Sequence, residues 1–120
     1  MNSTWNTCQV TNMNSIFRNA TNFNGDLSNW NTSQVTTMYA MFAYATNFNK
    51  DLSAWNTSQV TNMDYMFYGA NSLSQTNKCA IYESWKNNPA FISAGYVSDW
   101  CTSSHSTSRE LTHSIDLPPQ

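Results

Sequence analysis

The sequence predicts an α/β fold, a short right-handed solenoid in which each 25-residue coil contributes one short parallel strand and one helix. A motif that begins with tryptophan returns at a constant interval without insertion, starting at Trp5, Trp30 and Trp55. Within each interval, apolar residues recur at a helical spacing after a segment rich in residues that favour strands. A fixed period of roughly 20–50 residues is typical of stacked units, because one unit cannot bury its apolar face alone.

The middle of each repeat predicts a helix. In the second repeat the apolar positions follow one another at intervals of 3, 3, 1, 3 and 3 residues, which keeps them near one helical face. These residues are Val35, Met38, Met41, Phe42, Ala45 and Phe48. The helices are expected at about residues 10–21, 35–46 and 60–71.

The other part of each repeat predicts a short extended segment. Leucine, tryptophan and threonine recur with the spacing L-x-x-W-x-T at Leu27 and again at Leu52. Tryptophan and threonine favour half-buried strand positions. Stacking would join these segments into a parallel sheet and would place equivalent side chains above one another.

The repeats are expected to end in a C-terminal cap. The periodic pattern breaks after Leu73, and a short helix is expected between Cys79 and Lys86. The predicted units are three repeats at 5–29, 30–54 and 55–73 (truncated), a cap at 74–101, and a disordered tail or linker at 102–120. No capping segment precedes the first repeat, so we expect either a fragment of a longer protein or self-association through the N-terminal coil.

The full pattern W-x-T-S-x-V-T-x-M-x-x-M-F-x-x-A-x-x-F-N-x-D-L-S-x-W runs in register from Trp5 to about Leu73. It resembles the bacterial surface-protein repeat of the BspA-like leucine-rich-repeat group. The resemblance implies an extracellular or cell-surface module that mediates interactions, with adhesion as the usual suggestion. The family offers no catalytic residues, so the resemblance implies none here.

The composition disfavours nucleic acid as a partner, and the sequence predicts neither a membrane span nor a secretory signal. Charged residues make up 10% of the chain, against about 25% in an average globular protein, and the net charge is −2. The five Lys and Arg residues are scattered, which disfavours nucleic acid as a partner. No apolar run approaches the roughly 18 residues of a membrane span, and the first residues lack the pattern of a secretory signal.

No catalytic, cofactor-binding or metal-binding set is predicted. Cys79 and Cys101 flank the cap and would either form a disulfide or remain as two thiols. A metal site that joins them to His105 and His113 is not expected, because the spacing does not match common zinc patterns. Two other features have structural interpretations: Cys8 replaces the serine of the other repeats, and Asp26 and Asp51 recur at one corner, as expected of turn residues.

The sequence favours binding over catalysis, with a protein or a glycan as the partner. The expected binding residues alternate with the inward-facing ones on the sheet and are Asn29, Asn31, Ser33, Ala54, Asn56 and Ser58. One alternative is a structural piece of a longer array, with no ligand of its own. Another is a threonine ladder that meets an ordered surface such as ice, which requires Thr7, Thr32 and Thr57 to be exposed.

Overall fold

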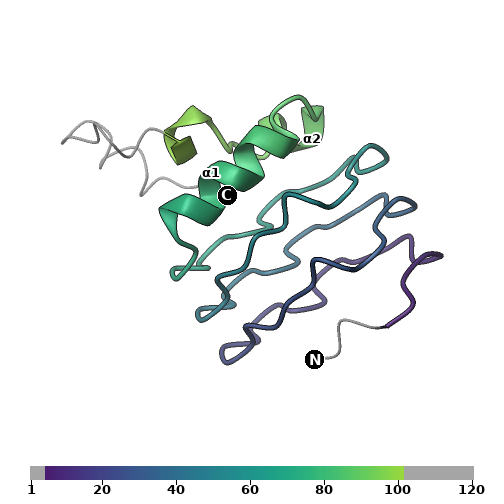
Figure 1. Cartoon of the computed structure of the whole chain (residues 1–120), viewed down its shortest axis with the longest axis horizontal. Coiled ribbons are helices and arrows are strands. Elements are labelled where there is room, and N and C mark those ends of the chain that lie inside the picture. Colours follow the sequence, from purple (N-terminus) through teal and green to yellow (C-terminus); the bar gives the residue numbers. More distant parts are fainter. Residues whose placement is uncertain (1–4, 102–120) are drawn as a thin grey trace.

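The computed structural model describes residues 5–101 and shows three repeats stacked in parallel, followed by short helices that cover one end of the stack (Figure 1). The repeats are the successive loops coloured from purple to teal, and α1 lies across the last of them. The helices are α1 (Gln75–Trp85), α2 (Pro89–Ser93) and the 3₁₀-helix η1 (Ser98–Cys101). The expected disordered tail at 102–120 lies outside the described residues.

The predicted strand and helix of each repeat are both wrong. No helix precedes α1 within the described residues, so the segments expected to be helical at 10–21, 35–46 and 60–71 are not. Extended pairing over the same part of the chain amounts to two isolated parallel bridges, Asn12–Thr37 and Thr37–Asn62, and no sheet forms. The α/β solenoid of leucine-rich-repeat type is therefore not the fold of this chain.

Each repeat is instead a series of β-turns, and this explains why the helix was predicted. In the second repeat, Met41 N–H donates to the Met38 carbonyl over 3.2 Å and Ala45 N–H donates to the Phe42 carbonyl over 2.9 Å. A β-turn returns residue i+3 to the side of residue i. Successive turns therefore bring every third side chain to the same side, which is close to the interval along a helical face. The L-x-x-W segment is also a turn, because Trp30 N–H donates to the Leu27 carbonyl over 3.0 Å.

Backbone N–H groups between these turns join one repeat to the next. Every second residue from Met38 to Tyr44 donates to a carbonyl of the third repeat, over 2.7–2.9 Å. The four donors are Met38, Ala40, Phe42 and Tyr44, and their acceptors are Asn62, Asp64, Met66 and Tyr68. An α-helix would use these N–H groups within its own turns. Helical repeats and this ladder between repeats are therefore mutually exclusive.

The turns require left-handed backbone at two positions in each repeat. These positive φ angles occur at Ser15, Asn19, Ala40, Tyr44, Tyr65 and Gly69. Asn19, Tyr44 and Gly69 are equivalent positions in the three repeats. Gly69 has φ of 76°, and a Cβ atom there would lie 2.7 Å from Cδ1 of Tyr44. Glycine adopts this conformation without steric cost, whereas other residues occupy it at a cost that the surrounding structure must offset.

Aromatic rings form continuous stacks through the core. Trp5, Trp30 and Trp55 stack with ring centroids 6.2 and 6.4 Å apart, and Trp85 of α1 adds a fourth ring at 6.5 Å. A parallel stack joins Phe17, Phe42 and Phe67 at 5.4 and 5.7 Å. Apart from the exposed Trp5, these large rings are buried and supply much of the apolar area that stabilises the fold.

The recurring threonines form a buried ladder of hydrogen bonds. The Thr7 hydroxyl donates to the Asn31 carbonyl over 3.0 Å, and the Thr32 hydroxyl donates to the Asn56 carbonyl over the same distance. Both hydroxyl groups belong to buried residues, as does Thr57. The hypothesis of an exposed threonine surface that meets ice or a crystalline polymer is therefore wrong.

The segment after Leu73 packs against the third repeat. The side chain of Ser74 accepts a hydrogen bond from Asn77 N–H and caps α1, which begins four residues before the helix expected from the sequence. The buried Tyr96 hydroxyl accepts a hydrogen bond from Phe67 N–H over 3.0 Å. A disulfide joins Cys79 of α1 to Cys101 of η1.

None of the helices in residues 5–101 has the length and apolar character that a membrane span needs.

Replacing Thr32 by valine is expected to lower the free energy of unfolding by about 1–2 kcal/mol, because it leaves the Asn56 carbonyl without its buried donor. Urea denaturation followed by circular dichroism measures the change. Thr46→Val is the control, since the Thr46 hydroxyl makes a long 3.5 Å contact to the Thr21 carbonyl at an exposed position. Equal losses for the two variants would contradict the structural importance of the buried ladder.

Reduction of the Cys79–Cys101 disulfide is expected to lower the free energy of unfolding by about 3 kcal/mol, because the bond closes a loop with a sequence separation of 22 residues. Urea denaturation with and without a phosphine reductant, both in the presence of a metal chelator, measures this loss. A Cys8→Ser chain controls for exchange with the exposed free thiol. An unchanged midpoint would mean that the bond contributes little to stability.

Candidate functional site

The residues predicted to bind a partner are exposed, except Ser33, which is half-buried. Two of the asparagines close local turns. The Asn31 carboxamide oxygen accepts from the N–H and hydroxyl of Ser33 over 2.9 and 2.7 Å, and Asn56 accepts from the N–H of Ser58 over 2.9 Å. This arrangement is an Asx-type turn, so these asparagines shape the backbone as well as the surface. They do not share a sheet face, because no sheet exists among the described residues.

A groove runs between the third repeat and the helices that cover it. Its volume is about 730 Å³, and Asn56 and Ser58 are the two predicted binding residues that line it. The remaining four, Asn29, Asn31, Ser33 and Ala54, lie elsewhere. Hydroxyl and carboxamide groups line the groove together with apolar side chains, and none of its lining residues is charged. The groove therefore suits an uncharged ligand.

A second hollow, formed by turns of all three repeats, is lined mainly by tyrosine. Its volume is about 200 Å³, and the side chains around it include Arg18, Tyr39, Tyr44, Tyr65 and Tyr68, which we call the tyrosine face. The rings meet edge to face, with centroids 5.7 Å apart for Tyr39 and Tyr65 and 5.5 Å apart for Tyr44 and Tyr68. Tyr44 is 43% exposed. This packing holds several large rings in fixed positions at the surface.

The tyrosine face lies where the three repeats differ from one another. Tyr44, for example, corresponds to Asn19 in the first repeat and to Gly69 in the third. The tryptophans, phenylalanines and threonines that build the core recur instead, so the fold depends on these side chains, whereas it accepts different side chains at the tyrosine positions. The tyrosine face was not predicted from the sequence, because the predicted sites lie at positions where the repeats share a pattern. The available signal was aromatic residues at positions where the repeats disagree.

The recurring aspartates each accept a hydrogen bond within a turn. Asp26 accepts from the N–H of Ser28 over 2.9 Å, and Asp51 accepts from the N–H of Ser53 over 2.8 Å. The hydrogen bonds from Ser28 hold the pKa of the Asp26 carboxyl below its usual range. Both side chains thus stabilise turns, in the role expected from the sequence.

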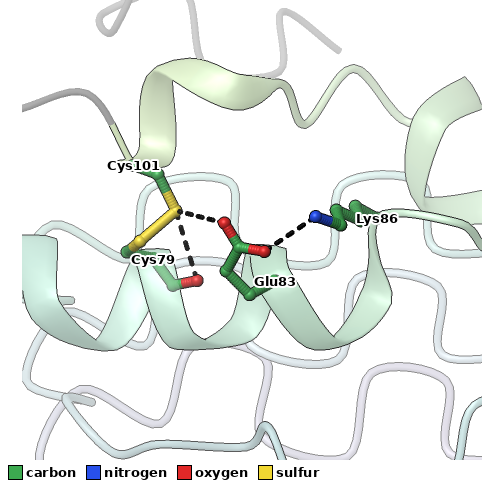
Figure 2. A network of polar contacts seen from close by, with 4 residues as sticks. All are labelled: Cys79, Glu83, Lys86 and Cys101. Atoms are coloured by element: carbon green, nitrogen blue, oxygen red, sulfur yellow. Dashed lines mark hydrogen bonds and ion pairs between the residues drawn. A yellow bond between two sulfur atoms is a disulfide. The ribbon is translucent and has the colours of Figure 1, made fainter.

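The disulfide lies beside a carboxylate (Figure 2). The Sγ atom of Cys101 lies 3.8 Å from Oε2 of Glu83, and Oε1 of Glu83 forms an ion pair with Lys86 Nζ at 2.8 Å. The hydrogen bond with Glu83 raises the pKa of the Lys86 ammonium group. The metal site that the sequence disfavoured joined the cysteines to distant histidines and did not include Glu83, which follows Cys79 by four residues and so lies one helical turn away.

Comparison with known proteins adds a family but no described function. A model of a family described as "Mycoplasma protein of unknown function, DUF285" matches residues 2–94. The curated proteins gave no match, and neither did the solved structures. The matched segment contains the three repeats together with α1 and α2. Because the match covers far more than half of the 120 residues, the chain belongs to the DUF285 family, whose function is unknown.

Proposed function

We propose that the chain is a non-enzymatic module that binds a protein partner through the tyrosine face. The observation that carries the proposal is the gathering of four tyrosines and Arg18 around one surface hollow. Tyrosine and arginine are enriched at protein interfaces, where a few such residues carry most of the binding energy. Tyrosine also brings a large contact area at a small cost in side-chain entropy.

The chemistry of the face favours one kind of partner segment. Arg18 is the cation among the residues that line the hollow, and no carboxylate is among them. A partner carboxylate would form a charge-assisted hydrogen bond with the guanidinium group. The neighbouring rings would receive an apolar or aromatic side chain. We therefore expect the bound segment to carry an Asp or Glu close to an apolar residue.

Binding is preferred to catalysis because the recurring aspartates and the two cysteines of the cap have structural partners. Asp26 and Asp51 accept hydrogen bonds within turns, and Cys79 and Cys101 are bonded to each other. The proposed setting is the cell surface or the extracellular space. The resemblance to BspA-like surface repeats supports this setting, and so does the disulfide, since such bonds persist in oxidising surroundings.

A structural role without a ligand is the second candidate, and the N-terminal end of the stack favours it. Trp5 is 53% exposed, whereas the equivalent Trp30 and Trp55, each covered by a ring on both sides, are 5% and 3% exposed. Exposed apolar area of this kind marks a surface that packs against another chain or segment. Self-association through this end belongs to the same proposal.

The three repeats themselves supply variants that test the tyrosine face. Tyr39→Asn, Tyr44→Asn, Tyr65→Ala and Tyr68→Ala each introduce the residue that an adjacent repeat carries at the equivalent position, so the fold is expected to persist. The four substitutions are combined in one chain, the fourfold variant. Peptides selected by the unchanged chain from a phage-displayed random library are expected to bind the fourfold variant at least about 10-fold more weakly. Fluorescence anisotropy with the selected peptides measures this change.

The control is Asn29→Ala, which introduces the residue of the equivalent Ala54 on a different surface, and it is expected to leave binding unchanged. A glycan array is probed with the same proteins. Neutral glycans that bind both the unchanged chain and the fourfold variant, but not an Asn87→Ala groove variant, would assign the function to the groove. Failure to select any peptide or glycan would favour the structural role.

A further inference from the structure

Three potential metal ligands meet where η1 packs on α1 (Figure 2). Cys79 and Glu83 lie one turn apart on α1, and Cys101 approaches them from η1. Their sulfur and carboxylate oxygen atoms all lie within 4.8 Å of one another. Two ligand atoms on a tetrahedral zinc ion are roughly 3–4 Å apart, so small side-chain rotations bring these atoms to coordinating positions.

The sulfur atoms become available for a metal after reduction. A dithiol supplies two electrons and two protons, each sulfur of the Cys79–Cys101 bond becomes a thiol, and the dithiol is oxidised to its own disulfide. Two thiols and the Glu83 carboxylate then share one small volume. Ionisation of both thiols there would bring three negative charges together, which is costly unless a cation neutralises them.

Contacts other than the disulfide also hold η1 in place, one to α1 and others to Phe67 of the third repeat and to Tyr96. The Gln75 carboxamide donates to the Trp100 carbonyl. The Trp100 ring is buried, with centroids 5.6 Å from Phe67 and 5.0 Å from Tyr96. These contacts keep Cys101 close to α1 when the sulfur atoms separate.

We propose that the reduced chain binds one Zn²⁺ ion through Cys79 Sγ, Cys101 Sγ and the Glu83 carboxylate, with water as the fourth ligand. Thiolate and carboxylate are established zinc ligands, and soft thiolates favour zinc over magnesium or calcium. Lys86 holds Oε1 of Glu83 at 2.8 Å, while Oε2 faces the sulfur of Cys101. The lysine thereby orients the carboxylate toward the metal position.

The two redox states then fasten the cap in different ways. In oxidising surroundings the covalent bond joins α1 to η1. In reducing surroundings the zinc ion makes the same connection and releases the two thiol protons. Zinc affinity therefore rises with pH, by up to about 100-fold per pH unit while both thiols remain protonated in the free chain.

The test is a zinc titration of the full chain against a chromophoric chelator, with and without a phosphine reductant that does not compete strongly for zinc. We expect one zinc ion per chain after reduction and none before it. Cys79→Ser and Cys101→Ser are expected to abolish stoichiometric binding. Glu83→Gln, which preserves side-chain size, is expected to weaken binding about 10-fold or more, with circular dichroism confirming that each variant is folded.

Two control chains identify the ligands. Cys8→Ser and the double variant His105→Ala/His113→Ala remove the remaining thiol and both histidines, and each is expected to bind zinc as the unchanged chain does. Loss of binding in either control would overturn the proposed ligand set. Equal affinity of the reduced unchanged chain and its folded Glu83→Gln variant would overturn the role of the carboxylate, and absence of zinc from the reduced chain would overturn the site itself.

Discussion

The fold depends on how each repeat divides its peptide groups between two tasks. Some N–H groups close turns within the repeat, and others donate to the next repeat. The inter-repeat bonds keep the repeats in register, and the buried aromatic stacks follow from that register. If the turn bonds were helical, no N–H would remain to connect the repeats. The positive φ angles at two positions per repeat are the conformational cost of this division.

The segment after the last repeat continues the ladders and then ends them. Ser74 N–H donates to the Asn49 side chain over 2.9 Å, just as Asn49 N–H donates to the Asn24 side chain over 2.7 Å. Trp85 extends the tryptophan stack although it lies on a helix. The Tyr96 hydroxyl accepts from Phe67 N–H, so a side chain takes the position of a backbone carbonyl of a further repeat. The segment after Leu73 thus makes contacts like those of a further repeat, although its backbone conformation is different.

The sequence was sufficient to reveal the repeat period and to predict that equivalent side chains, such as Trp5, Trp30 and Trp55, lie above one another. It was not sufficient to predict the backbone, because the residue spacing of successive β-turns resembles that of a helix over the short run from Val35 to Phe48. Parallel bonding between repeats leaves no local pattern in the sequence, since its partners lie about one whole repeat apart along the chain. For Cys79 and Cys101 the sequence left two alternatives open, a disulfide or two thiols, and the structure shows the disulfide. The tyrosine face was hidden because its residues do not recur.

The strict register between repeats also limits how the chain can change in length. Adding or removing one whole repeat shifts every ladder by a single rung, so each donor still meets an equivalent acceptor. An insertion that is not a whole repeat, placed among these turns, would leave the Met38 and Phe42 N–H groups facing positions without a matching carbonyl. Length variation by duplication of whole units is therefore tolerated, whereas small insertions are confined to exposed corners. Each added unit would also bring a new set of positions with variable side chains next to the tyrosines, extending the surface without altering the core that supports it.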